Sequence, residues 1–298
     1  MSRSLKAHLL LILVTFIWGA TFVVIKSALT EISPLLFNAI RMTLAAVCLG
    51  VVFRKQIAQA NAAVVRSGII VGIFLWLGYE FQTTGLVLTT PSKSGFLTGI
   101  SVALVPLFMA MFWRRKVNRW TLVGVVAAFL GLFLMTVPAN DSILGDWSSV
   151  NRGDVLTLTC AVAFALQIIL LGHASQRHGF AAMAFLQTAV AAMLMFATVP
   201  VVEQSFVTWS SKVVLAILVT GVLGTAFAFT TQAWAQQFTP PSHTALIFAL
   251  EPVFAWATSY LVLGERLGWR ASQGAALILG GVLLSELKGT PQETPESG

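Results

Sequence analysis

Apolar residues in this chain fall into long runs that are separated by short polar gaps. Most runs are about 17–25 residues long, which is the length a helix needs to cross roughly 30 Å of hydrocarbon. They do not alternate with a period of two and are far longer than barrel strands, so strands are not expected. The pattern predicts an all-α membrane protein with ten transmembrane helices, over about residues 7–29, 34–53, 67–88, 94–113, 120–137, 154–173, 180–200, 213–235, 241–263 and 268–287.

Composition favours a lipid bilayer over water as the solvent of this fold. Hydrophobic residues make up 57% of the 298 residues and charged residues only 10%, with a mean hydropathy of +0.86. Soluble domains contain about 25% charged residues, and a soluble fold this apolar would expose large apolar patches. The net charge of +7 does not indicate a nucleic-acid partner, because the basic residues lie in the gaps between apolar runs, where they orient membrane proteins.

Signals for other kinds of chemistry are missing from the sequence. Cys48 and Cys160 lie inside apolar runs and are interpreted as packing residues. The histidines show no His-x-x-x-His spacing, and no Gly-x-x-x-x-Gly-Lys-[Ser/Thr] motif is present, so we expect no metal site, cofactor or catalytic residue. Arg3 and Lys6 precede the first run as they would in a signal peptide, but the run continues to about Leu29, which favours a retained helix.

The distribution of basic residues predicts the orientation in the membrane. With the N-terminus in the cytoplasm, eleven Lys and Arg residues lie in inner segments and five in outer segments, which favours both termini inside. The inner residues are Arg3, Lys6, Arg54, Lys55, Arg66, Arg114, Arg115, Lys116, Arg119, Arg177 and Lys288, and the outer ones are Lys93, Arg152, Lys212, Arg266 and Arg270.

The two halves of the chain align with each other. Five helices per half is an odd number, so the second half enters the membrane from the opposite side, as in the inverted repeats of many secondary transporters. We therefore expect a first repeat over residues 1–137, a linker over 138–153, a second repeat over 154–287 and a polar, disordered tail over 288–298. The aligned pairs are Trp18 with Phe164 and Arg41 with Gln187 at an offset of 146, and Gln82 with Gln232, Ser92 with Ser242, Gly124 with Gly274 and Gly131 with Gly281 at an offset of 150.

Three groups of short motifs resemble a known family. They are Ile17-Trp18-Gly19, the segment Ser94–Gly99 with Val105-Pro106-Leu107, and Leu250-Glu251-Pro252 with Leu263-Gly264-Glu265-Arg266-Leu267. On these motifs the chain resembles the drug/metabolite transporter superfamily, specifically its bacterial members with two EamA-type repeats. The resemblance implies ten helices in inverted five-helix repeats, alternating access around a central cavity, and transport of small solutes, often export. It does not define the substrate.

Charges inside apolar runs are costly and usually functional. Lys26 lies near the outer end of the first helix, where its side chain reaches the interface. Arg41 and Glu80 lie roughly 10 Å and 12 Å deep at 1.5 Å per residue, so an Arg41–Glu80 pair is one hypothesis. Such a pair has two interpretations, a structural contact or a role in substrate contact or gating.

Glu251, Pro252 and Pro106 are candidates for gating or coupling, together with Arg41. Glu251 lies near the predicted midplane, where an unpaired carboxylate would take up a proton. The alternative is a neutral, hydrogen-bonded acid that holds helices together. Each proline removes one helical hydrogen bond and frees a carbonyl group, which predicts a bend beside protein or a water-filled cavity. A plain packing kink is an equal alternative.

Aromatic and polar side chains at helical spacing form the candidate substrate site. Aromatic residues with a few polar groups suit an amphipathic ligand, although such stripes also serve in packing or as an interface belt. Glycine pairs at 124 and 131 and at 274 and 281 are interpreted as packing seams. The candidate substrate-binding residues are Trp18, Trp76, Tyr79, Glu80, Gln82, Phe164, Gln167, Gln232 and Trp234.

These features predict a secondary transporter of small amphipathic metabolites, amino acids first among them, working as an exporter by alternating access. The predicted location is the bacterial inner membrane, as a monomer or homodimer, with the lipid bilayer and a small-molecule substrate as partners. A proton-coupled multidrug exporter that uses Glu251 or Glu80 is the alternative within this class. A membrane-embedded enzyme or a receptor is the alternative outside it. An enzyme would need clustered nucleophiles or metal ligands, and a receptor would need larger loops than the chain has.

Overall fold

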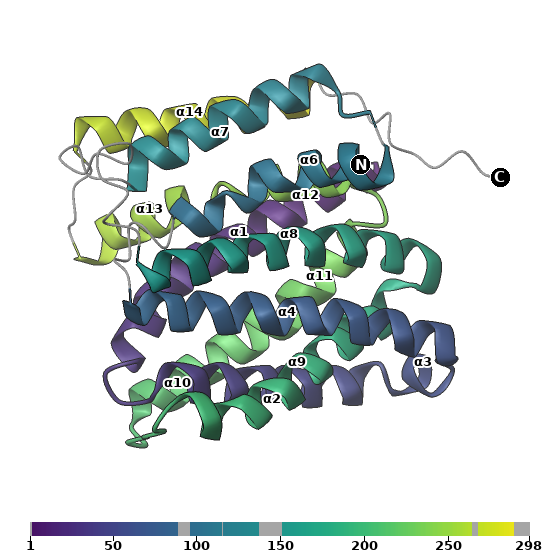
Figure 1. The fold of residues 1–298 in the computed structure, drawn as a ribbon, viewed down its shortest axis with the longest axis vertical. Helices are drawn as coiled ribbons and strands as arrows, with labels where there is room; N and C mark the ends of the chain where they lie inside the picture. Colours follow the sequence, from purple (N-terminus) through teal and green to yellow (C-terminus); the bar gives the residue numbers. More distant parts are fainter. Residues whose placement is uncertain (1, 89–95, 115, 137–150, 264–267, 289–298) are drawn as a thin grey trace.

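The computed structural model describes residues 2–88, 96–114, 116–136, 151–263 and 268–288, and they form a stack of helices (Figure 1). Each of the ten predicted segments is helical over most of its described residues. Outside the helices, the described part of the chain has one isolated β-bridge, between Ile32 and Val207. The helices are α1 (Arg3–Ala28), α2 (Pro34–Val52), α3 (Arg54–Ala58), α4 (Ala62–Leu88), α6 (Ser101–Trp113), α7 (Arg119–Thr136), α8 (Arg152–His178), α9 (Phe180–Val202), α10 (Ser211–Gly221), the π-helix η2 (Val222–Phe227), α11 (Ala228–Ala235), α12 (Pro241–Phe248), α13 (Glu251–Leu263) and α14 (Trp269–Lys288).

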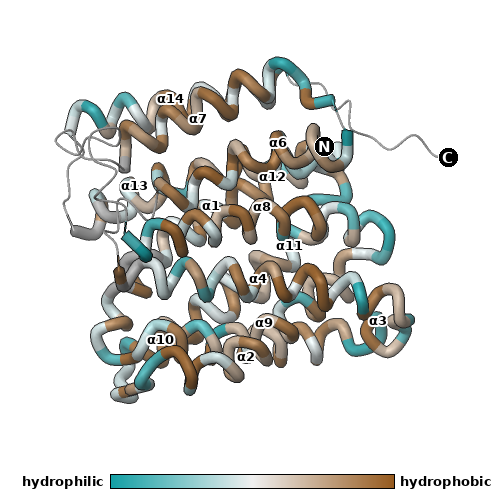
Figure 2. Tube along the Cα trace, viewed as in Figure 1, coloured by the Kyte–Doolittle hydropathy of each residue, from teal (hydrophilic) through white to brown (hydrophobic). Residues whose placement is uncertain are grey.

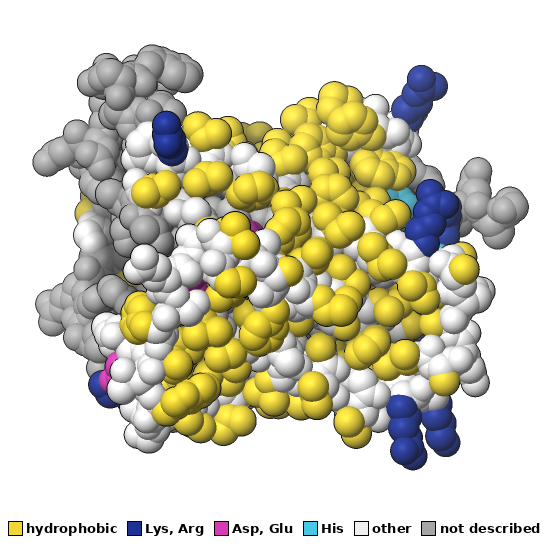
Figure 3. Space-filling model, turned by 60° about the horizontal axis from the view of Figure 1, so that its bottom comes forward, with side chains coloured by type: hydrophobic (Ala, Val, Ile, Leu, Met, Phe, Trp, Pro, Cys, Tyr) yellow, Lys and Arg dark blue, Asp and Glu magenta, His cyan; other side chains and the backbone are white. Residues whose placement is uncertain are grey.

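Length and hydropathy identify the parts of this stack that suit a bilayer. Within the described residues, seven segments are long and apolar enough to cross a membrane. The hydropathy of the chain is highest along the helices and falls at the connections between them (Figure 2). On the surface drawn in Figure 3, apolar side chains form a broad band, and the Lys and Arg side chains gather at its two ends. The seven segments are Arg3–Thr21, Pro34–Val52, Ala62–Gly85, Phe96–Trp113, Arg152–His178, Phe180–Val202 and Ser211–Ala235.

The stack runs from α7 and α14 at one edge to α2 and α9 at the other (Figure 1). The α7–α14 seam is built on glycine. A Cβ atom on Gly124 would lie 2.6 Å from the carbonyl oxygen of Gly281, and one on Gly131 would lie 2.5 Å from that of Gly274. The four glycines that align between the two halves therefore lie at one interface, where Gly124 meets Gly281 and Gly131 meets Gly274. The packing seam predicted from their spacing is confirmed, and it lies within the monomer.

Two connections far apart in sequence are joined at one end of the molecule. The backbone N–H of Ser33 donates to the carbonyl of Phe206 at 3.0 Å, and that of Thr208 donates to Glu31 at 2.7 Å. The Glu203 carboxylate accepts hydrogen bonds from the first backbone N–H groups of α2, those of Leu35 and Leu36. A carboxylate is favourable there, because it satisfies orphan donors and opposes the helix dipole.

The observed helices differ in three details from those predicted from the sequence. The short helix α3 follows α2 directly and was not predicted. The predicted helix over 213–235 is divided by η2, in which an extra residue widens the turn. The predicted helix over 241–263 ends at Phe248 and restarts at Glu251. This last break agrees with the bend predicted at Pro252, because proline lacks the N–H that a continuous helix would need and is tolerated in a first turn.

Candidate functional site

A close helix crossing places Trp18 at the centre of the molecule. A Cβ atom on Gly19 would lie 2.7 Å from the backbone nitrogen of Ala255 and 2.9 Å from the carbonyl oxygen of Glu251. Only glycine lets α1 approach the first turn of α13 this closely. The ring of the preceding residue, Trp18, then lies 4.9 Å from that of Phe248 and 5.9 Å from that of Phe229, between centroids.

The indole N–H of Trp18 also has a hydrogen-bond partner. Its indole N–H donates a 2.7 Å hydrogen bond to the carbonyl oxygen of Gly224, inside η2. A π-helical turn disturbs the regular i to i−4 bonding of its carbonyl groups. The indole therefore satisfies a backbone acceptor that would otherwise be costly in a low-dielectric interior.

The aromatic side chains of α4 and α8 meet on the other side of this centre. The Tyr79 and Phe164 rings pack edge to face with centroids 5.4 Å apart. The site for a Cβ on Gly78 is filled by the Phe164 ring, at 2.3 Å. Trp18, Trp76, Tyr79 and Phe164 all pack against the same buried cluster, which includes Phe229. The sequence-derived aromatic candidates from three different helices are thus brought together.

Arg41 of α2 is buried against these aromatic rings. Its side chain is 6% exposed, and its guanidinium lies 4.7 Å from the centroid of the Tyr79 ring. The Nε atom has no hydrogen-bond partner. Electrostatic interactions connect Arg41 with Tyr79 and with Glu251. The Nε–H of this buried guanidinium is therefore a donor without a partner, and such groups require an explanation.

The predicted Arg41–Glu80 pair is wrong, since no ion pair joins these two residues in the described part of the chain. Tyr79 and Glu80 are consecutive on α4, so their side chains point about 100° apart, and Tyr79 is the one that faces Arg41. Glu80 is 8% exposed and lies beside Thr198 and Trp76. Its Oε1 atom has no hydrogen-bond partner, and neither has the indole nitrogen of Trp76.

Three buried glutamines form a chain between helices. The amide of Gln167 donates to Gln187 at 2.8 Å, and the amide of Gln232 donates to Gln167 at 3.3 Å. The Nε2 atom of Gln187 and the Oε1 atom of Gln232 remain unpaired at the two ends. Gln187 was not a binding candidate, although its alignment with Arg41 was an available signal. Gln82, the aligned partner of Gln232, is half-buried on α4 and makes no hydrogen bond to any described side chain.

The two proline candidates occupy different positions in their helices. Pro252 is the second residue of α13, directly after Glu251, so the acid lies at a helix N-terminus where a negative charge is stabilised. Pro106 is buried inside α6, which continues through it. The helical residues 96–99 run on into α6, because Ile100 has helical dihedral angles and its carbonyl accepts from the backbone N–H of Leu104 at 3.0 Å.

Trp234 lies apart from the other candidates. Its ring packs 5.1 Å from Phe238, and the Lys6 ammonium lies 5.6 Å from its centroid. Lys6 precedes Trp18 by twelve residues, or about 18 Å along α1. Lys26, a snorkelling candidate, has a side chain that lies outside the described part of the structure. No cluster of His, Cys, Asp and Glu that would suit a metal ion occurs among the described residues.

The helix stack, its apolar surface and its buried polar centre define a multi-pass membrane protein. The chain matches the EamA-like transporter family twice, over residues 5–137 and 151–287, and it belongs to that family. This is a family of transporters and not of enzymes, as the resemblance of the motifs implied.

Individual proteins similar to this chain carry the same general description. An uncharacterized transporter of Archaeoglobus fulgidus is 34% identical, covering 96% of this chain and 87% of that protein. The uncharacterized transporter YoaV of Bacillus subtilis is 26% identical, with 94% of this chain and 96% of that protein covered. A solved crystal structure of a protein superimposes with a TM-score of 0.77 at 18% identity, covering 96% of this chain and 99% of that one, which supports the fold.

Proposed function

We propose that this transporter moves small amphipathic metabolites, amino acids first among them, and that it exports them by alternating access. The observation that supports the substrate class is the buried Arg41 guanidinium, with an unused Nε donor, lying over the Tyr79 ring. A guanidinium pairs best with a carboxylate, which it binds through two parallel hydrogen bonds. Every amino acid supplies one.

The surroundings of Arg41 suit the rest of an amino acid. The carboxyl group of Glu251 interacts electrostatically with Arg41, and Glu80 has an unpaired oxygen on the neighbouring helix, so each is a candidate partner for the substrate's ammonium group. The rings of Trp18, Trp76 and Phe164 supply apolar walls for a side chain. Gln167 and Gln232 extend the polar lining.

The proposed architecture is ten transmembrane helices in two inverted five-helix repeats, residues 1–137 and 154–287, with residues 138–153 as the linker. Helix packing supports it. When each helix of a contacting pair is replaced by its counterpart in the other repeat, five helices away, the resulting pair is also in contact. The first helix, α1, packs on α13 of the ninth, and the sixth, α8, packs on α6 of the fourth. Likewise α4 of the third packs on α8, and α11 of the eighth packs on α1.

Alternating access would use hinges in the ninth and fourth helices. The ninth helix is interrupted at Ala249 and Leu250, directly before Glu251 and Pro252, and the fourth lacks one helical hydrogen bond at Pro106. Hinges are short irregular segments that absorb changes in φ and ψ. In the proposed orientation both termini are cytoplasmic in a bacterial inner membrane, supported by the excess of Lys and Arg at that end.

Efflux from liposomes tests this proposal. The purified protein would be reconstituted, and efflux of a panel of labelled amino acids would be measured with and without a pH gradient. We expect saturable, protein-dependent efflux that Arg41→Gln abolishes, while Lys212→Gln, an exposed cation outside the centre, leaves it intact. If folded protein in sealed vesicles released no amino acid, the proposed substrate class would be wrong. Efflux that follows the gradient would favour proton coupling.

A further inference from the structure

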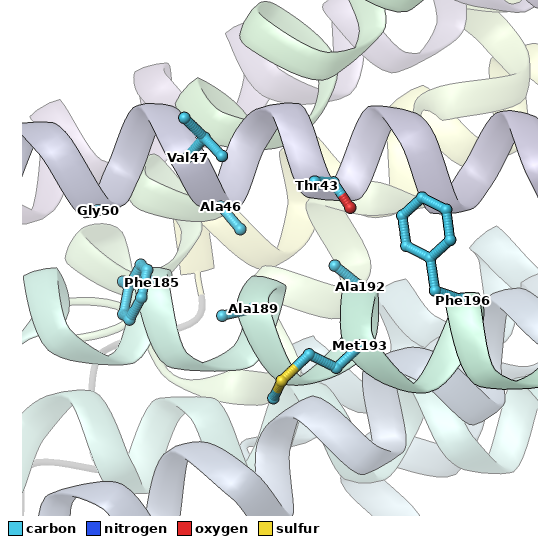
Figure 4. A pocket seen from close by; sticks show the side chains of 9 residues that line it. All are labelled: Thr43, Ala46, Val47, Gly50, Phe185, Ala189, Ala192, Met193 and Phe196. Carbon is cyan, nitrogen blue, oxygen red and sulfur yellow. The ribbon is translucent and has the colours of Figure 1, made fainter.

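A groove between α2 and α9 opens on the apolar surface of the molecule. It has a volume of about 590 Å³, and its lining includes Ala46, Val47 and Gly50 of α2 and Phe185, Ala189 and Phe196 of α9. Figure 4 shows these side chains along the two facing helices. Small residues on both helices leave the space that the aromatic rings border.

The groove faces the bilayer and not the transport site. Val47 is 60% exposed and Met193, which also lines the groove, is 65% exposed. Almost all of the lining is apolar, with Thr43 the one residue among the nine that has a polar side chain. In a membrane protein, an exposed apolar hollow at this position is filled by hydrocarbon.

Positive charge lies at one end of the groove. Gly50 is the last groove residue on α2, and Arg54 and Lys55 of α3 follow it by about one helical turn, with exposed side chains. The Phe53 ring packs edge to face on Phe180 at the start of α9, with centroids 5.8 Å apart. This contact holds α3 beside the α8–α9 turn, which adds the exposed side chain of Arg177.

We propose that the α2–α9 groove and the basic pair Arg54 and Lys55 together bind one anionic phospholipid. An acyl chain lies along the groove beside Phe185 and Phe196, and the phosphate lies at Arg54 and Lys55. The charge complementarity explains why a short, exposed, doubly basic helix is packed at this end of an apolar hollow. Basic residues next to the hydrocarbon region attract anionic headgroups in this way.

Native mass spectrometry of the purified full-length protein tests the site. Phosphatidylglycerol and phosphatidylcholine with identical acyl chains would be titrated in parallel. We expect phosphatidylglycerol to bind more tightly, and Arg54→Gln with Lys55→Gln to weaken it roughly thirtyfold, or about fivefold for each basic residue. Phosphatidylcholine binding should not change. If the double variant does not fold, Arg54→Gln alone retains a roughly fivefold test.

A second variant tests the groove and leaves both charges in place. Ala189→Phe fills the hollow and should weaken binding of both lipids, whereas Val126→Phe, on the exposed face of α7, should weaken neither. The charge control is Lys116→Gln with Arg119→Gln, which removes two cations beside α7, at the opposite edge of the stack (Figure 1).

Three results would overturn the site. The first is an equal loss of phosphatidylglycerol in the charge control, which would indicate a general electrostatic effect. The second is equal affinity of the native protein for both lipids. The third is a dimer that Ala189→Phe converts to monomer, because a second copy of the chain would then be the occupant of the groove.

Discussion

The indole N–H of Trp18 donates a 2.7 Å hydrogen bond to the carbonyl oxygen of Gly224, 206 residues later in the chain. The bond joins the first helix to the π-helical segment of the eighth. The acceptor belongs to η2, the one π-helical stretch among the described residues. Trp18 also contacts Phe248, directly before the interruption between α12 and α13. One side chain therefore touches two irregular segments of the second half.

Trp18→Phe keeps the aromatic ring and removes only the donor. We expect unfolding to become easier by about 1 kcal/mol, the usual net value of a hydrogen bond, because the Gly224 carbonyl loses its partner. Transport should fall roughly two- to tenfold as the π-helical segment loses its fixed position. Thermal unfolding in detergent and efflux from liposomes measure the two effects. Trp209→Phe, at a side chain that is 63% exposed, is the matched control and should change neither.

The helices could be predicted from the sequence because their lengths are imposed by the membrane. The break before Pro252 was also readable, since proline lacks the N–H that a continuous helix needs, although α6 continues through Pro106. The π-helical turn η2 was not readable, because Val222 to Phe227 lie inside a long, mostly apolar run and contain no proline or other local signal for an extra residue in the turn. Its position depends on partners such as Trp18, which only the tertiary structure reveals.

The depth of the candidate site residues in the membrane could be predicted from the sequence, but the direction in which each side chain points from its helix could not. Arg41 and Glu80 were placed at similar depths from their positions in the apolar runs. Which neighbour a side chain meets depends on the rotation of the helix, and a shift of one residue changes the direction by about 100°. Arg41 therefore faces Tyr79 instead of Glu80. Trp234 differs in depth instead, because it lies at the end of the molecule beside Lys6, one residue before the end of the predicted helix 213–235.

Arg41→Lys should separate the charge of Arg41 from its shape. Lysine keeps the positive charge but loses the planar guanidinium that lies over Tyr79 and binds a carboxylate through two bonds. We expect the KM for efflux to rise about tenfold, corresponding to roughly 1.4 kcal/mol, with little change in thermal stability.

The same residue is suited to a double-mutant cycle with Glu251. Because the two interact electrostatically, Arg41→Gln and Glu251→Gln together should destabilise less than the sum of the single variants, by about 0.5–3 kcal/mol. Additive effects in the unfolding measurement would show that the two residues act independently. Glu203→Gln, which removes the charge and one of the two acceptors that cap α2, is the comparison and should be additive with Arg41→Gln.

Glu31 should make the stability of the molecule depend on pH. Its carboxylate accepts a hydrogen bond from the Ser210 hydroxyl and pairs with Lys212 at 3.2 Å, and these contacts lower the pKa of Glu31. Because the pKa of Glu31 is lower in the folded protein than in the unfolded chain, the ionised carboxylate stabilises the fold at pH values above the unfolded-state pKa, about 4.3 for glutamate. That contribution is lost as the pH falls through the folded-state value.

Thermal unfolding across an acidic pH series measures this contribution. The native protein should unfold at a higher temperature than Glu31→Gln at pH 6, and the difference should shrink as the pH drops below about 4.3. Lys212→Gln should show part of the effect, because the Ser210 hydroxyl still donates to Glu31. A difference between native protein and Glu31→Gln that stays constant with pH would contradict the assignment.

Packing at the α7–α14 seam predicts that replacing glycine with alanine changes the stability in opposite directions at two positions of α14. Gly274→Ala places a methyl group about 2.5 Å from the carbonyl oxygen of Gly131, which is backbone and has no side-chain freedom to yield. The helices must separate, and we expect the protein to lose about 1–3 kcal/mol of stability.

Gly280 is exposed on the same helix, and a Cβ there meets nothing within 4 Å. Gly280→Ala should therefore stabilise by up to about 1 kcal/mol, since alanine is the better helix former. Unfolding temperatures of both variants, measured in one detergent, test the pair, and a loss of similar size at both positions would show that the seam does not depend on the close Gly131–Gly274 approach.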